Sequence, residues 1–241
     1  MPFEKSQIGI IFLTIVTKTD LLMCKITLIA TVHKEYGSCN STELYKLIEP
    51  IAADAIFEEL SPNGFTAIYG GLDSDTLETN TIKSYIQKYP ISHLPVDLEK
   101  NELINKDLKN DILEMFEIFR QSYQYNILLA QHNILSQLVG FPYLNSYQFS
   151  ELSERRISLE KSILKKMNHE KWLLTYKRWE DIIERRENEM VKNIYNYCDR
   201  NKYTKAVFLI GAEHKKPIMD KILKFETQNK NDLNWNFNYF I

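Results

Sequence analysis

Two stretches of the sequence decide the fold: residues 25–33 read KITLIATVH and residues 205–214 read KAVFLIGAEH. Both are almost continuously apolar and contain β-branched residues, a pattern typical of strands that are buried on both faces of a parallel sheet. Each apolar run leads to a histidine, His33 in the first stretch and His214 in the second. Since the chain has only five histidines, their place at these two strand ends indicates that the strand ends form a site.

The first hundred residues alternate between helical and strand patterns. Asn40 stands three residues before Glu43 and predicts a helix start, and Pro50 predicts where that helix ends. In chain order we expect a helix over 41–50, a strand over 54–60, a turn and a glycine-containing loop over 61–75, a helix over 76–89 and a strand over 91–99. This order predicts an α/β fold with a mostly parallel central sheet and a split βαβ core.

A large helical insertion is expected over about 100–204. Glycine and proline are absent between Pro95 and Gly140, and again between Pro142 and Gly211, and apolar residues recur at intervals of three and four. The expected elements are one long helix over 107–139, helices over 150–166 and 169–200, a strand over 205–211, a helix over 216–226 and a closing strand over 234–241. We expect residues 23–241 to form a single α/β domain that contains this insertion.

The first 22 residues are expected to form an N-terminal extension or an extra strand. Residues 8–16, IGIIFLTIV, also fit the apolar core of a signal peptide. The polar TKTD that follows, and the lack of a small-residue cleavage pattern, favour the extension. No stretch reaches the roughly 18 apolar residues that a spanning helix needs, so no transmembrane segment is expected.

Charge and cysteine content restrict the class of protein. The 241 residues include 30 basic and 32 acidic side chains, which argues against a nucleic-acid interface, because phosphate binding needs a basic face. The three cysteines, Cys24, Cys39 and Cys198, have no CxxC spacing. This pattern predicts reduced, incidental thiols and a cytoplasmic location.

Titratable side chains follow each of the predicted parallel strands: His33, the pair Glu58 and Glu59, Asp97, and His214. Ligands of open α/β sheets bind beyond the carboxyl ends of the strands, and two imidazoles with a carboxylate are a common ligand set for first-row metals. Side chains alternate along a strand, so only one residue of the acidic pair can face such a site. The alternative is that all of these are ordinary hydrogen-bonded or solvated residues at the rim of the sheet.

Four short motifs occur in order: ATVH at 30–33, ADAIFEEL at 53–60, RRENEM at 185–190 and FLIGAEH at 208–214. Together they resemble the TraB/Tiki family, which has two GxxH motifs, a Glu-Leu pair ending the second strand and an Arg-x-x-x-Met helix before the last motif. The resemblance covers about residues 25–97 and 185–222. The helical middle is similar only in its general helical pattern. The matched positions are His33, Glu59, Asp97, Arg186, Met190 and His214.

The chain departs from the family pattern at three positions. Ala30 replaces the glycine of the first GxxH motif, which is expected to narrow a turn there. Glu213 replaces a glycine that often precedes the second histidine, and is expected to act in the site as an extra ligand or to pair with Lys215. Leu98 follows Asp97 where the family usually has arginine.

The resemblance implies a metal-dependent hydrolase, since the family includes metal-dependent peptidases and related folds include erythromycin esterases. The implied cofactor is a divalent ion held by His33, Glu59 and His214, with Mn²⁺, Co²⁺ or Zn²⁺ preferred to Mg²⁺. Arg186 is expected to stabilise a developing oxyanion or to pair with Asp97. Its alternative is an ion pair on the helix surface.

Two other functions remain open for the same residues. The chain is either a metal-free, esterase-type hydrolase in which one histidine is the general base, or a binding protein that holds its ligand without turnover. In every case we expect a peptide or small molecule in the site. Glu187 and Glu189 are expected to be solvated rather than functional.

Overall fold

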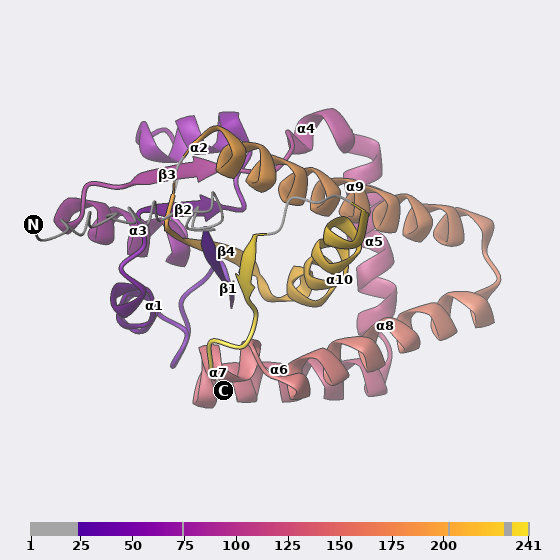
Figure 1. Cartoon of the computed structure of the whole chain (residues 1–241). Coiled ribbons are helices and arrows are strands. Elements are labelled where there is room, and N and C mark those ends of the chain that lie inside the picture. The colour runs from indigo at the N-terminus through magenta and orange to yellow at the C-terminus, as the bar shows by residue number, and fades with distance from the viewer. Residues whose placement is uncertain (1–23, 74, 202, 229–232, 241) are drawn as a thin grey trace, which may run out of the picture.

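The core of the chain is a parallel sheet. The computed structural model describes residues 24–73, 75–201, 203–228 and 233–240, and its strands lie in the order β3-β2-β4-β1-β5, all parallel (Figure 1). The strands are β1 (Lys25–Thr31), β2 (Ala55–Glu58), β3 (Ser92–Pro95), β4 (Lys205–Gly211) and β5 (Asn234–Asn236). The predicted α/β class with a parallel sheet is confirmed.

The two strands with the most apolar sequences lie side by side inside the sheet. Their register pairs Ile29 with Leu209 and Thr31 with Gly211, so β1 and β4 end at the same level. Parallel strands that end together bring the residues that follow them to one edge. His33 and His214 therefore belong to the same edge, although 180 residues separate them in the chain.

Helices cover both faces of the sheet, and the alternation of side chains along the strands explains how. Ile56 packs in one apolar cluster, on the face of α1 (Ser41–Ile48), the 3₁₀ turn η1 (Glu49–Ile51), α3 (Leu77–Lys88) and α7 (Phe141–Leu144). Its neighbour Phe57 packs in a second cluster, on the face of α9 (Glu170–Arg200) and α10 (Ala212–Gln228). The two faces thus have separate cores.

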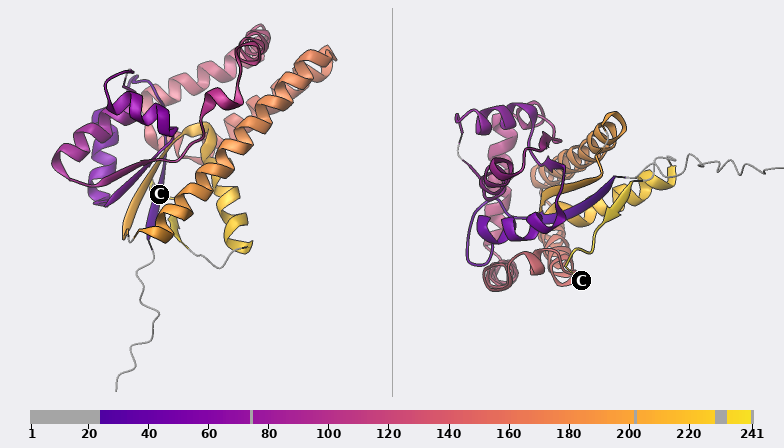
Figure 2. Two further views of the ribbon diagram at one scale, coloured as in Figure 1. Left: turned by 90° about the horizontal axis from the view of Figure 1, so that it is seen from above. Right: turned by 60° about the vertical axis from the view of Figure 1, so that its left-hand side comes forward.

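The predicted helical insertion lies between β3 and β4 and is confirmed. It contains α4 (Lys100–Leu103), α5 (Lys106–Arg120), α6 (Tyr123–Val139), α7, α8 (Tyr147–Met167) and α9. Away from the sheet it has an apolar core of its own, formed by Met115, Phe119, Tyr125, Leu164 and Tyr176. Figure 2 shows these helices, coloured magenta to orange, extending well beyond the sheet.

Three expectations about individual elements are wrong. The turn and loop after β2 contain a helix, α2 (Pro62–Tyr69), because Ser61 caps it by accepting from the Gly64 N–H and Pro62 occupies its first turn. The long helix over 107–139 is two helices, since α5 ends at Arg120 and Ser122 caps α6. Helix α10 begins at Ala212, directly after β4, rather than near residue 216.

The expectation for residues 1–22 falls outside the part of the chain that the structure describes. Within the described residues, no helix combines the length and the apolar character that a membrane span requires.

Candidate functional site

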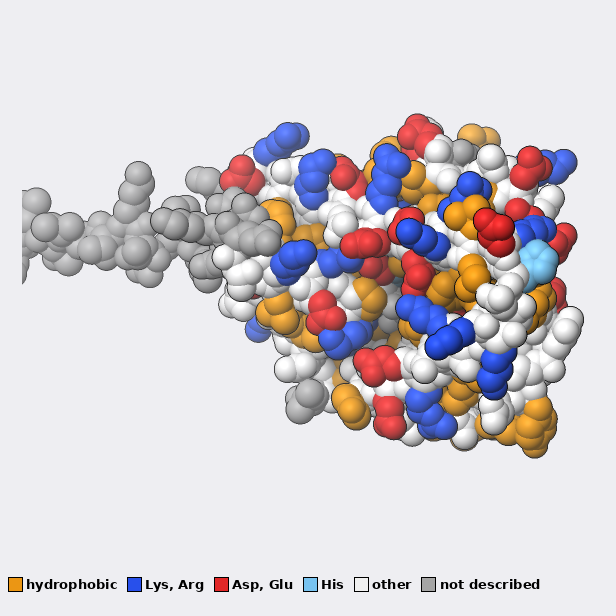
Figure 3. Space-filling view, turned by 90° about the vertical axis from the view of Figure 1, so that its right-hand side faces the viewer, with side chains coloured by type: hydrophobic (Ala, Val, Ile, Leu, Met, Phe, Trp, Pro, Cys, Tyr) orange, Lys and Arg blue, Asp and Glu red, His pale blue; other side chains and the backbone are white. Residues whose placement is uncertain are grey.

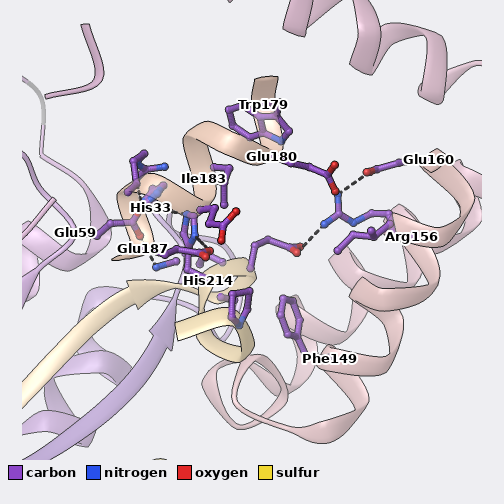
Figure 4. Close-up of a pocket in the computed structure, with 18 of the residues that line it drawn as sticks. His33, Glu59, Phe149, Arg156, Glu160, Trp179, Glu180, Ile183, Glu187 and His214 are labelled. Carbon is purple, nitrogen blue, oxygen red and sulfur yellow. Dashed lines mark hydrogen bonds and ion pairs between the residues drawn. The ribbon is translucent and has the colours of Figure 1, made fainter. Parts of the chain in front are cut away.

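Three of the predicted site residues meet at the last residue of β4. A Cβ atom built on Gly211 would lie 3.2 Å from Glu59 Oε2, and 3.8 Å from both His33 Nε2 and His214 Cδ2. The side chains that follow β1, β2 and β4 therefore converge on one point, where glycine leaves them room (Figure 4). This is the carboxyl edge at which the sequence predicted a site.

Glu59 lies at the centre of this cluster. Its Oε1 is 2.6 Å from Arg186 Nη2 and 3.4 Å from His214 Nε2, and its Oε2 accepts a hydrogen bond from the Gly211 N–H at 2.8 Å. Burial favours the neutral acid, but the charges that His214 and His33 carry when protonated, the guanidinium of Arg186 and the Gly211 N–H together outweigh burial and lower the pKa of Glu59. Glu59 is therefore held as a carboxylate.

Glu58 points away from this cluster, as strand alternation requires. Its Oε1 is 2.7 Å from His93 Nδ1, and its Oε2 accepts from the Tyr69 hydroxyl at 2.7 Å. Glu59, not Glu58, lies beside His214.

Arg186 joins Asp97 to the cluster. Its guanidinium donates to both Asp97 carboxylate oxygens, with the shortest contact 2.7 Å, while also contacting Glu59. Burial opposes the charged form, but the hydrogen bonds and the negative charge of Asp97 outweigh it and raise the pKa of Arg186. The pairing with Asp97 is confirmed, and the alternative of a surface ion pair is wrong because Arg186 is buried.

His214 stands in the first turn of α10 and is oriented by a residue of α9. Its Nδ1 lies 2.8 Å from Glu187 Oε1, and Glu187 is buried, with 2% of its surface exposed. The expectation that Glu187 is solvated is therefore wrong. The sequence held a signal: Glu187 lies three and seven residues before the buried Met190 and Ile194, on the buried face of the helix.

His33 has a similar partner that no motif indicated. Its Nδ1 is 3.0 Å from Glu78 Oε1, an oxygen that also accepts from the Thr31 hydroxyl at 2.8 Å. Glu78 lies in the first turn of α3 and is buried, and its Oε2 has no hydrogen-bond partner among the described residues. The His33 side chain itself is 56% exposed, against 12% for His214.

The two residues that replace family glycines, Glu213 and Ala30, do not make the contacts expected of them. Glu213 accepts from the Ser153 hydroxyl at 2.6 Å and pairs with Arg156 at 2.7 Å. Lys215 donates instead to the Asn145 side chain at 2.9 Å, so the expected Glu213–Lys215 pair is not formed. Ala30 lies within β1 rather than in a turn, and its backbone N–H and C=O both bond to Asn145.

A cavity of about 660 Å³ opens beside the cluster. His33, Glu59, Arg186 and His214 line one part of it. The largest apolar side chains of its lining come from the helical insertion: Phe116, Phe149, Ile157, Trp179 and Ile183. Such a volume fits a small organic molecule or part of a peptide.

On the side of the molecule shown in Figure 3, acidic and basic side chains intermingle with apolar ones.

The apolar lining of the cavity could not be predicted from the sequence, because its residues come from three helices and no local pattern specifies how these helices dock.

The residues fit a divalent cation by donor type and charge. Two imidazoles lie beside one carboxylate: His214 Nε2 is near Glu59 Oε1, while His33 Nε2 lies near Gly211 on the side of Glu59 Oε2. A carboxylate contacts Nδ1 of each ring, as is common around protein metal sites. By position the fit is incomplete: in the described part of the chain no three His, Cys, Asp or Glu side chains are placed so that they could hold an ion. Both oxygens of Glu59 are bonded by Arg186 and Gly211.

Comparison of the chain with models of known families, with curated proteins and with solved structures gives no match. The resemblance to the TraB/Tiki family therefore depends on the motif residues alone and stays a prediction.

Proposed function

We propose that this chain is a hydrolase that cleaves an ester or amide bond with the help of a divalent metal ion held by His33, Glu59 and His214. One observation carries the proposal. Each of the two imidazoles contacts a buried carboxylate through Nδ1, while His214 Nε2 faces Glu59 and His33 Nε2 faces Gly211, all beside one cavity. A ring that donates its Nδ1–H to a carboxylate presents an Nε2 lone pair, which is the form that binds a metal or accepts a proton.

The balance of buried charge supports a cation at this place. Four buried carboxylates, those of Glu59, Glu78, Asp97 and Glu187, lie in this region against two positive charges, the guanidinium of Arg186 and the ammonium of Lys221, which is 3.6 Å from Glu187. Buried charges that lack a counter-charge are costly. A divalent ion, or protonation of the imidazoles, would offset the excess of negative charge.

When bound, the metal ion would supply a Lewis acid that polarises the substrate carbonyl and lowers the pKa of water. The chain's own residues orient the groups around it. Glu187 and Glu78 fix the tautomer and direction of His214 and His33, and Arg186 keeps Glu59 ionised and in place. The contacts of Arg186 support this positioning role, and its contact with a developing oxyanion stays a prediction.

A metal-free hydrolase is the second candidate, and the present contacts of Glu59 favour it. Arg186 and the Gly211 N–H already satisfy both oxygens of Glu59. In that case His214, oriented by Glu187, would accept the proton of an attacking water, as the histidine of a catalytic dyad does.

Metal content and turnover test these proposals together. The purified chain would be analysed for bound metals and screened, with and without Mn²⁺, Co²⁺ and Zn²⁺, against ester and peptide substrates. We expect metal-supported turnover that His214→Ala removes. The matched control is His93→Ala, because His93 also contacts a buried glutamate but does not line the cavity. Metal-independent turnover that His214→Ala removes would favour the second candidate, and no turnover under any condition would leave a binding protein.

A further inference from the structure

The basic side chains that line the cavity are all held between carboxylates. Arg186 contacts Glu59 at 2.6 Å and Asp97 at 2.7 Å. Arg156 contacts Glu160 at 3.1 Å and Glu213 at 2.7 Å. An arginine compensated twice in this way offers little attraction to an anionic ligand.

The third basic residue of the lining is held in the same way, more loosely. Lys221 lies 3.6 Å from Glu187 and 4.0 Å from Glu184. The lining contains six glutamates against these three basic residues: Glu59, Glu160, Glu180, Glu184, Glu187 and Glu213. One further cation, the exposed Lys161 outside the lining, pairs with Glu180 at 2.8 Å, which still leaves more acidic than basic groups. The electrostatic environment of the cavity therefore favours neutral or cationic ligands over anions.

Helix α9 places an acidic row beside an apolar row in the cavity wall. Trp179 and Ile183 are four residues apart and so share one side of the helix, and Glu180 and Glu184 form the adjacent row. The Trp179 ring packs edge-on against Phe116, with centroids 6.0 Å apart. Figure 4 shows Trp179 and Glu180 on the wall that faces Arg156 and Phe149, away from Glu59.

We propose that this cavity binds a compact amphiphilic organic cation, a molecule with one ammonium group and one aromatic or branched apolar group, and that it rejects anionic analogues. The apolar group packs against Trp179, Ile183 and Phe149, and the ammonium group lies near the row formed by Glu180 and Glu184. An aromatic ring next to carboxylates is a favourable environment for an ammonium ion. That such a cation is a substrate rests on the hydrolase proposed above. That the cavity binds it does not depend on that proposal.

The test uses three probes of nearly equal size: phenethylamine, phenethyl alcohol and phenylacetate. Their binding to the full chain is measured by calorimetry at millimolar concentrations, without added metal and without turnover. We expect phenethylamine to bind at least about tenfold more tightly than phenylacetate, with the alcohol between them. Phenylacetate that binds as tightly as the amine, or no measurable binding of any probe, would overturn the inference.

Two variants and a control locate the binding. Glu180→Gln combined with Glu184→Gln is expected to reduce the ratio of amine to acid affinity by about threefold or more and to leave the alcohol unchanged. Trp179→Ala is expected to weaken all three probes. Glu189→Gln, on the same helix but outside the cavity lining, is the matched control and should change nothing. A ratio that stays constant in the double variant would overturn the assignment of the acidic row.

The outcome is independent of the hydrolase proposal. If the probes rank as expected while no ester or peptide is cleaved, the ligand class stands and the hydrolase proposal fails. If esters are cleaved while phenylacetate equals phenethylamine in affinity, the hydrolase stands and the ligand class fails.

Discussion

Two histidine–glutamate pairs on opposite sides of β2 have nearly the same contact and different surroundings. His214 Nδ1 lies 2.8 Å from Glu187, and His93 Nδ1 lies 2.7 Å from Glu58. His93 packs against Phe65 with the two rings tilted and their centroids 4.9 Å apart, outside the cavity lining. His214 lines the cavity, and its second ring nitrogen faces Glu59.

The comparison separates a histidine–carboxylate pair that lines a cavity from one that does not, and it defines what we require of a site. The second ring nitrogen must reach another polar group beside a space that a ligand can enter. His214 meets this condition, while His93 and its glutamate lie beside the aromatic rings of Phe65 and Tyr69. The predictions below test whether this difference in surroundings decides the role of each residue.

The largest effect is expected from replacing Arg186, which lines the cavity together with His214. Arg186→Met leaves the buried carboxylates of Glu59 and Asp97 without their counter-charge and should lower the free energy of unfolding by about 3–5 kcal/mol. Chemical denaturation measures this loss. Arg185→Met, at the exposed neighbouring position, is the control and should change stability by less than about 0.5 kcal/mol. Equal losses in both variants would contradict the buried network.

The next effect is the stabilisation that a metal ion provides. A ligand at 100 times its Kd stabilises the folded state by about 2.7 kcal/mol. Metal-stripped protein should therefore gain at least about 5 °C in melting temperature with Mn²⁺, Co²⁺ or Zn²⁺, and little with Mg²⁺. His33→Ala and His214→Ala should each remove the gain, and His93→Ala should retain it. Identical melting with and without every ion would exclude the metal site.

Much of this site could be predicted from the sequence, because strand ends are local features. His33, Glu59, Asp97 and His214 each follow an apolar run, and parallel strands bring such residues to one edge. Arg186 came from the motif resemblance and not from the strand pattern.

The partners of the histidines could not be predicted in the same way. Glu78 lies on a helix, where a glutamate is ordinarily solvated, and only the docking of α3 onto the sheet buries it. The spacing of Glu187 places it on the buried face of α9, but its contact with His214 depends on the docking of that helix. The break between α5 and α6 at Ser122 could not be predicted for a related reason. A serine without glycine or proline nearby does not interrupt an apolar helical pattern, and the turn depends on packing between α5 and α6.

A smaller effect separates the two adjacent glutamates. Glu59→Gln should weaken metal binding by about tenfold or more, because the amide keeps the shape of the side chain but loses its charge. Glu58→Gln should leave metal affinity unchanged, since Glu58 contacts Tyr69 and His93 instead. Calorimetric titration with the metal ion measures the affinity of both variants. The opposite ranking would place Glu58 in the site and reverse the assignment of the two faces.

The smallest effect concerns a third kind of histidine, which lines the cavity without a carboxylate on its ring. His132 Nδ1 lies 3.4 Å from the Tyr143 hydroxyl, and its ring packs 5.6 Å from Phe149. Burial lowers the pKa of His132 below its ordinary value of 6.5, an effect that Arg156 reinforces and the charge of Glu213 opposes. In acid the unfolded chain therefore takes up this proton before the folded chain does, so stability is lost as the pH falls below 6.5.

His132→Phe removes this proton uptake and should lose less stability than the wild type between neutral pH and about pH 5. Denaturant unfolding at several pH values measures the difference. His169→Phe, at an exposed position at the start of α9 and outside the cavity lining, is the control for replacing a histidine by phenylalanine. If the free energy of unfolding of His132→Phe changes with pH as that of the wild type does, then His132 is hydrated in the cavity. Its position in the lining, without a carboxylate partner, then has no effect on its protonation.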